Sequence, residues 1–190
     1  YEKSKTEQFI KENRIWWGKD GTNTVPALKR FLSEVRDGLT PYNLWTYEEV
    51  GHTQEATKEV EDLFGAKVFD FPKPVRLLSR VVQLSTTSDS LIVDFFSGSA
   101  TTAQAVFSMN ARDAGHRRFI LVQIPEETPE NSVAKKKGFD TICQLGEERI
   151  RRAGAKVKAE VEEANRQLKL GEEPKPVPDI GFRVLRIDSS

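Results

Sequence analysis

Residues 92–103 read Ile-Val-Asp-Phe-Phe-Ser-Gly-Ser-Ala-Thr-Thr-Ala, and they decide the fold. The apolar start predicts a buried strand over residues 92–96, with an acid, Asp94, near its end. The small residues at 97–100 predict a tight turn, and a helix is expected from Thr101 to Met109. Small side chains let a ligand lie against the backbone, and the first turn of a helix offers free N–H groups.

A strand, a small-residue turn and a helix in this order are typical of the start of a Rossmann-type binding site in an α/β fold. The turn keeps only Gly98 of the dinucleotide fingerprint, and it contains no lysine of a phosphate loop. Asp94 would also repel a phosphate, since like charges repel. A cationic or zwitterionic ligand fits better, and a plain strand–turn–helix crossover without a ligand is the alternative.

A second informative segment lies just upstream, where Phe71-Pro72-Lys73-Pro74 places a cation between two prolines. Prolines stiffen the loop, and Pro74 suits the first turn of a helix. The apolar spacing predicts that this helix runs from about Val75 to Leu84. The alternative is an ordinary helix that follows a rigid loop.

Two segments, PKPVRLLSRVV at 72–82 and DFFSGSATTA at 94–103, resemble the amino-group DNA methyltransferases that use S-adenosyl-L-methionine (AdoMet). Three more, RIWWGKDG at 14–21, LWTYEEVGHTQEA at 44–56 and GFDTICQLGEERIRR at 138–152, are similar to the modification subunits of type III restriction–modification systems. The resemblance extends from about Arg14 to Asp188. It implies a partial, Rossmann-like, AdoMet-dependent methyltransferase fold that forms the cofactor-binding half of the domain.

The resemblance also implies a cofactor site. Lys73 and the helix start would border the methionine carboxylate, and Asp94 would face the methionine amino group. A zwitterion needs such a donor and such an acceptor. Thr101 and Thr102 are expected to cap the helix after the turn. The implied cofactor-binding residues are Lys73, Pro74, Val75, Asp94, Phe96, Gly98, Ser99, Ala100, Thr101 and Gln123.

Three positions depart from the family pattern, and one of them, Gln104, stands where the family often has a histidine. Ala100 stands where the family usually has a second glycine, and its Cβ would crowd the ligand or resist a positive φ, so weakened binding is the expected result. Gln123 stands where an acid would hold the ribose hydroxyls, and Glu126 or Glu127 is the alternative for that role.

The catalytic Asn/Asp-Pro-Pro-Tyr/Phe loop of amino-group methyltransferases is not found in this sequence. Thr40-Pro41-Tyr42-Asn43 is only superficially similar, and it is interpreted as a turn. We therefore expect no catalytic residue here, a chain that is a piece of a longer polypeptide, and a fragment that is inactive alone. No metal site is predicted.

Composition is that of a folded chain with a well-solvated surface. The 190 residues are 37% hydrophobic and 31% charged, with a formal net charge of zero that gives no support to DNA contact. The only cysteine, Cys143, excludes an internal disulfide, and no apolar run reaches the length of a membrane span. A cytoplasmic location in bacteria, away from membranes, is expected.

Three regions are expected along the chain: the end of a target-recognition region at 1–50, the AdoMet-binding core with a long helix at 51–170, and a linker with a terminal strand at 171–190. The predicted strands lie at 92–96, 118–124 and 182–187. A hairpin is expected near Ile15, and helices are expected at 27–35, at 53–63 with Thr53 as its cap, and within 140–170.

The function implied by the resemblance is methyl transfer from AdoMet to adenine N6 in double-stranded DNA within a type III restriction–modification system. The implied partners are a second modification subunit, forming a homodimer, and a helicase–nuclease restriction subunit. The alternative is a non-catalytic DNA-binding or subunit-assembly module that retains the methyltransferase fold. A nicotinamide-dependent oxidoreductase would require the glycines that the turn lacks.

Overall fold

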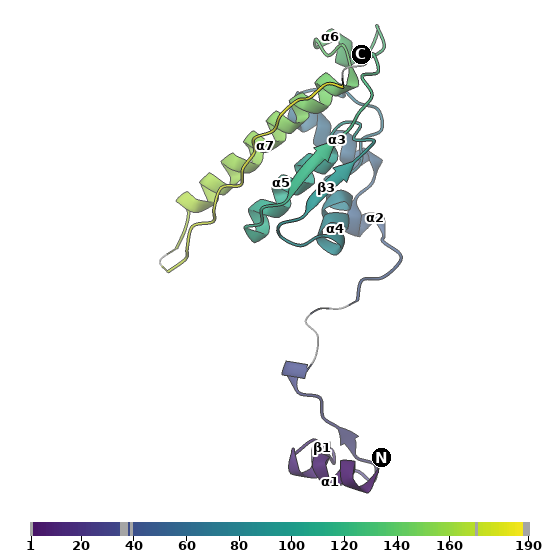
Figure 1. Ribbon diagram of the computed structural model, residues 1–190, viewed down its shortest axis with the longest axis vertical. Coiled ribbons are helices and arrows are strands. Elements are labelled where there is room, and N and C mark those ends of the chain that lie inside the picture. The colour runs from purple at the N-terminus through teal and green to yellow at the C-terminus, as the bar shows by residue number, and fades with distance from the viewer. Residues whose placement is uncertain (1, 35–37, 39, 170, 188–190) are drawn as a thin grey trace. The chain divides into compact units, whose positions relative to one another are not determined.

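The computed structural model describes residues 2–34, 38, 40–169 and 171–187 (Figure 1). By internal contacts the chain forms two compact units, Tyr1–Asn43 and Leu44–Ser190. This division lies before the expected boundary at residue 50. The assignment of residues 1–50 to a target-recognition region stays a prediction.

The first unit contains a helix and a small hairpin. Helix α1 (Lys3–Lys11) precedes strand β1 (Ile15–Trp16), which pairs antiparallel with β2 (Ala27–Leu28). The hairpin near Ile15 is therefore confirmed. The helix predicted over residues 27–35 is wrong, because cross-strand hydrogen bonding draws its first residues into β2. Only a short 3-10 turn, η1 (Leu32–Glu34), follows, and position 35 lies outside the described residues.

The second unit is built on a parallel pair of strands. Strand β3 (Leu91–Asp94) pairs with β4 (Arg118–Leu121), in a register that sets Asp94 opposite Leu121. Helix α5 (Thr101–Asp113) connects them. Parallel neighbours need such a crossover, so this is a βαβ unit. The strands predicted at 92–96 and 118–124 are both present, although they end earlier than expected.

The second unit contains further helices besides α5. They include α2 (Tyr47–Val50), α3 (Thr53–Phe64), α4 (Val75–Ser85), α6 (Val133–Lys136) and α7 (Ile142–Arg166). Helix α5 packs against both α4 and α7. The predicted helices at 53–63, 75–84 and within 140–170 are confirmed. The predicted cap Thr53 is not the N-cap of α3, because the His52 ring accepts the hydrogen bond from the Glu55 amide at 3.3 Å.

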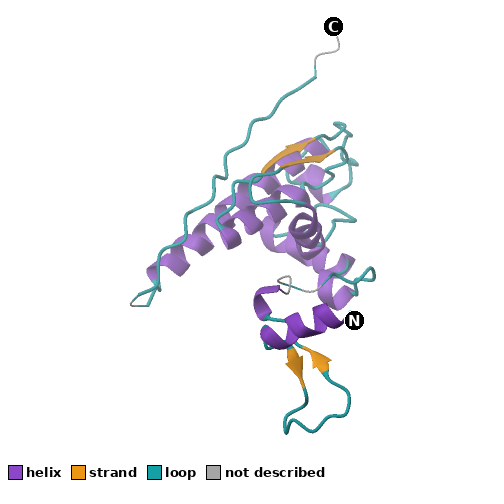
Figure 2. Ribbon diagram, turned by 60° about the horizontal axis from the view of Figure 1, so that its bottom comes forward, coloured by secondary structure: helices purple, strands orange, loops and turns teal. Residues whose placement is uncertain are grey.

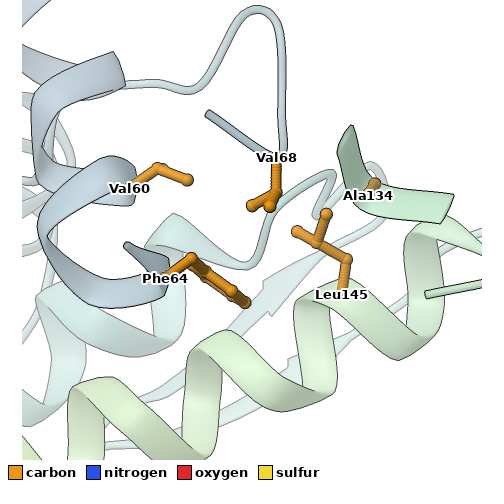
Figure 3. Close-up of a cluster of buried hydrophobic side chains, with 5 residues drawn as sticks. All are labelled: Val60, Phe64, Val68, Ala134 and Leu145. Atoms are coloured by element: carbon orange, nitrogen blue, oxygen red, sulfur yellow. The ribbon is translucent and has the colours of Figure 1, made fainter. Parts of the chain in front are cut away.

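Two groups of buried side chains hold the second unit together. The first joins α3, α6 and α7 and consists of Val60, Phe64, Val68, Ala134 and Leu145 (Figure 3). The second lies between α5 and α7 and consists of Ala100, Ala103, Phe107, Ile150 and Val157. The long helix α7 therefore contributes to both cores, and it fixes the turn before α5 relative to α3.

The C-terminal segment lies along α7 instead of joining the sheet (Figures 1 and 2). The strand predicted at 182–187 is wrong, because these residues pair with no strand in the described chain. Ile180 and Phe182 pack against the α5–α7 core, and the Arg151 guanidinium lies 5.4 Å from the centre of the Phe182 ring. Gly154 permits this close approach, since a Cβ there would lie 3.0 Å from the Ile180 Cβ.

Candidate functional site

A cleft of about 170 Å³ opens where the turn after β3 meets the loop before α4. Its lining residues come from both segments that the sequence singles out, and they are Phe69, Phe71, Pro72, Lys73, Leu78, Asp94, Phe96, Ser97, Gly98, Ser99, Thr101 and Thr102. The cleft thus brings Lys73 together with Asp94. Four candidate residues, Pro74, Val75, Ala100 and Gln123, are not part of the lining.

The carboxylate of Asp94 is held in place at the end of β3. Its Oδ1 accepts a hydrogen bond from the Phe96 amide at 3.1 Å, and its Oδ2 accepts one from the Thr102 hydroxyl at 2.6 Å. Thr102 therefore orients the carboxylate. The expected capping role of Thr101 and Thr102 is wrong, because neither side chain caps α5 and the N-cap residue is Ala100.

The small-residue turn at 97–100 is fixed to the residues just after β4. The Ala100 amide donates to the Ser97 carbonyl at 2.7 Å, and the Ser97 amide donates to the Val122 carbonyl at 3.2 Å. The Gly98 amide donates to Gln123 Oε1 at 2.8 Å. Gln123 thus holds the turn through its side-chain oxygen.

The two acidic alternatives to Gln123 lie outside the cleft. Glu126 and Glu127 are both exposed, and Glu127 forms an isolated antiparallel bridge with Thr141, the N-cap of α7. The loop after β4 is therefore tied to the start of α7 at this point. The structure brings neither carboxylate into the lining of the cleft.

Ala100 adopts the left-handed conformation that glycine favours, with φ of 60°. The methyl group is buried in the α5–α7 core, and a Cβ built on Gly146 of α7 would lie 3.6 Å from it. The methyl group therefore faces α7 and does not line the cleft. Of the two expected consequences of a Cβ here, crowding of the ligand and resistance to a positive φ, the backbone shows the positive φ, and the expected weakening of ligand binding stays a prediction.

Replacing Ala114 by glycine is expected to raise the free energy of unfolding by about 0.5–1 kcal/mol, because this exposed residue also has a positive φ, 53°. Ala100→Gly removes the same unfavourable interaction between a Cβ and a backbone of positive φ. It also removes a buried methyl group whose burial contributes about 0.8 kcal/mol. Its net effect is expected to be close to zero. Urea denaturation of both variants measures the difference, and equal gains would show that the Ala100 methyl contributes no packing energy.

The start of α4 is occupied by an acidic side chain. The Val75 amide donates to Glu59 Oε2 at 3.0 Å, with Pro74 as the N-cap residue. Burial raises the pKa of Glu59, and the hydrogen bond from Val75 opposes that rise. Val75 therefore does not offer a free N–H group to the cleft, and Lys73, which is exposed, is the cation that the loop presents.

Arg149 of α7 is the residue that the sequence reasoning missed. Its side chain is among the largest fully buried ones, and Nη1 donates to Ser99 Oγ at 2.7 Å and to Thr101 Oγ1 at 2.8 Å. Burial lowers its pKa to about 10. One signal was available: Arg149 lies four residues after Leu145 and four before Ala153, on the apolar stripe of the long helix.

A parallel βαβ unit with a charged cleft at its turn places the chain among α/β proteins. The family model described as DNA methylase matches residues 2–136, and the chain belongs to this family. The sequence resemblance to modification subunits of type III restriction–modification enzymes is also confirmed, as the relatives below show. In the described residues, no helix combines the length and apolar character needed to cross a membrane.

Three relatives illustrate the similarity. The chain is 37% identical over 159 residues to the type III restriction-modification enzyme StyLTI Mod subunit of Salmonella typhimurium, covering 84% of this chain and 24% of the relative. It is 39% identical over 132 residues to the type III restriction-modification enzyme EcoPI Mod subunit of Escherichia phage P1, and the match covers 70% of this chain and 20% of the relative. It is 36% identical over 132 residues to the type II methyltransferase M.KpnI of Klebsiella pneumoniae, and the match covers 70% of this chain and 31% of the relative. The chain thus spans a third or less of these relatives.

Proposed function

We propose that this chain is the cofactor-binding part of a DNA methyltransferase and that the cleft holds AdoMet. The observation that carries the proposal is the meeting of Lys73 and Asp94 in one cleft whose floor is the small-residue turn. The carboxylate of Asp94 accepts hydrogen bonds from an ammonium group, and the ammonium of Lys73 pairs with a carboxylate. The amino-acid portion of AdoMet carries both groups.

The residues present fit this ligand. At about 170 Å³ the cleft is smaller than the roughly 300 Å³ at which small-molecule pockets begin, so it accommodates one portion of AdoMet. Phe69, Phe71, Leu78 and Phe96 supply apolar surface beside the two charges. When bound, AdoMet supplies an activated methyl group on a sulfonium. The chain's own residues bind and orient the amino-acid end of the cofactor.

In the whole protein, the proposed reaction is methylation of adenine N6 in double-stranded DNA within a type III restriction–modification system. The target base must leave the helix to reach the methyl group, and the barrier is lowered mainly by aligning the reacting atoms. The residues that hold the base are proposed to lie in another part of the polypeptide. A homodimer of modification subunits and a helicase–nuclease restriction subunit are the proposed partners, in a bacterial cytoplasm.

A second candidate function is a non-catalytic module for subunit assembly or DNA binding. The observation that favours it is the outer face of the sheet, where apolar side chains of β3, β4 and the residue just after β4 are exposed: Leu91, Val93, Ile120 and Val122. Exposed apolar patches of this kind mark interaction surfaces. This face is separate from the charged residues of the cleft, so the two functions are compatible in one chain.

Calorimetric titration of AdoMet into the full chain tests the cofactor site. We expect a single binding event that S-adenosylhomocysteine competes for, because both molecules share the zwitterionic amino-acid end. NAD, which lacks that end, serves as the control ligand and is expected to give no heat. A chain that binds duplex DNA or a second copy of itself, but gives no heat with AdoMet, would contradict the proposal and support the assembly module.

A further inference from the structure

Arg149 lies behind the turn that forms the floor of the cleft. We propose that Arg149 is the positioning residue of this turn: from α7 it holds Ser99 and Thr101 in the conformation that the ligand meets. The inference rests on the proposed function for its ligand, AdoMet, although the contacts themselves are those of the chain alone. Arg149 is not part of the lining, so it acts through the turn.

The guanidinium spans the turn and the first residues of α5. Nη1 donates to Ser99 Oγ at 2.7 Å and Thr101 Oγ1 at 2.8 Å, and it also approaches the Ser99 carbonyl at 3.4 Å. On the other edge, Nε and Nη2 donate to Gln104 Oε1 at 3.2 and 3.0 Å. One rigid planar group therefore fixes the backbone and side chain of Ser99 relative to the first turn of α5.

Packing alone does not explain an arginine here. The side chain is fully buried, and no carboxylate of the described residues lies within ion-pair distance. Among the described residues, Glu59 is the acidic group whose charge acts on Arg149, and its carboxylate is bound to the start of α4. Burying a cation without a paired carboxylate costs free energy that an apolar side chain would not. What the arginine adds is a set of directed hydrogen bonds to the turn.

Those bonds act at the strained part of the turn. Ser99 and Thr101 flank Ala100, whose left-handed backbone is unfavourable for any residue with a Cβ. Holding both neighbours keeps Ala100 in that conformation and keeps Ser99 and Thr101 in the lining of the cleft. Without the guanidinium, the turn is free to relax to an ordinary φ, which would move the floor of the cleft.

The test compares four variants of the full chain. Arg149→Met keeps the length and removes every donor, Arg149→Lys keeps the charge, and Gln104→Leu loosens the guanidinium without touching the cleft. Val161→Ala is the matched control, since Val161 is buried on the same helix several turns away. All are measured at a temperature at which circular dichroism shows the variant folded.

Amide hydrogen exchange is the first readout, and it needs no ligand. We expect the Ala100 amide, which donates to Ser97, to exchange about tenfold faster in Arg149→Met than in Val161→Ala, as loss of one or two hydrogen bonds predicts. Arg149→Lys is expected to restore part of the protection. Gln104→Leu is also expected to speed the exchange of the Ala100 amide. This variant therefore still tests the inference if Arg149→Met does not fold.

Calorimetric AdoMet binding is the second readout. Arg149→Met is expected to weaken binding about tenfold, with Arg149→Lys between it and the parent chain. Parent-like exchange at the turn in both Arg149→Met and Gln104→Leu overturns the inference. A parent chain that does not bind AdoMet refutes the proposed function instead, and the exchange comparison still decides whether Arg149 positions the turn.

Discussion

Replacing Asp94 by alanine is expected to weaken AdoMet binding by about a hundredfold. In the proposed site the carboxylate accepts hydrogen bonds from the ligand ammonium, and hydrogen bonds to charged groups contribute about 1.5–3 kcal/mol each. The substitution also leaves the Thr102 hydroxyl and the Phe96 amide without their present acceptor. Titration calorimetry of the parent and the variant measures the change directly.

Asp94→Asn separates charge from shape. Its side-chain oxygen still accepts from the Phe96 amide, so the turn is expected to keep its conformation, while the ammonium of the ligand loses its counter-charge. We therefore expect most of the hundredfold loss to persist in this variant. Asp89→Ala is the control, because Asp89 is an exposed carboxylate in the loop just before β3. Equal affinity in Asp94→Asn and the parent chain would show that the cleft does not bind a cationic amine through Asp94.

Elements whose structure is determined by a short, contiguous segment could be predicted from the sequence. The apolar run before Asp94, the small residues of the turn and the periodic helix after it are contiguous, and β3, the turn and α5 follow in that order. The rigid Pro72–Pro74 loop likewise predicted the start of α4 at Val75. Because both segments were recognised, their meeting in one cleft could be anticipated.

The predictions that failed are those that depend on contacts between distant segments. An alternating apolar pattern at 182–187 suits a strand, but Phe182 finds its partners on α7 instead of on a sheet edge. Residues 27–35 suit a helix, but pairing with β1 makes Ala27 and Leu28 a strand. In both cases the tertiary contact outweighs local propensity.

The unexpected side-chain roles have the same origin. The Thr102 hydroxyl reaches back to Asp94 instead of capping its own helix, and Gln123 reaches the Gly98 amide. Arg149 sits in a run of charged residues, and its spacing on the apolar stripe is the one signal of its role in the sequence. Its position on the apolar stripe becomes meaningful only when the turn packed against it supplies the acceptors for its donors.

Replacing Arg117 by methionine is expected to lower the free energy of unfolding by about 2–3 kcal/mol, as for breaking a largely buried ion pair. The Arg117 side chain is 5% exposed, and its two Nη atoms donate to the Asp113 carboxylate at 2.9 and 2.8 Å. Its Nε donates to Thr86 Oγ1 at 3.0 Å, which ties the end of α4 to the loop before β4. Asp113 is 37% exposed, so solvent compensates part of the loss and the expected effect stays below the largest values known.

The difference in the free energy of unfolding between the parent chain and Arg117→Met is expected to become smaller as the pH falls. The hydrogen bond from Arg117 lowers the pKa of Asp113 below its usual value of about 3.9. The stabilisation by the Arg117–Asp113 ion pair is therefore fully present above the pKa that Asp113 has in the unfolded chain. It is lost as the pH falls through the lower pKa that Asp113 has in the folded chain. The difference between the parent chain and Arg117→Met should narrow below about pH 4.

Urea denaturation at pH 7 and at a series of acidic pH values measures both effects. Arg118→Met is the control, because Arg118 is the exposed neighbour on β4 and its loss is expected to change the free energy of unfolding by less than about 0.5 kcal/mol. A difference between the parent and Arg117→Met that stays constant into acid would contradict the ion-pair account. It would assign the cost of the substitution to the Thr86 hydrogen bond and to packing at the junction of α4, α5 and β4.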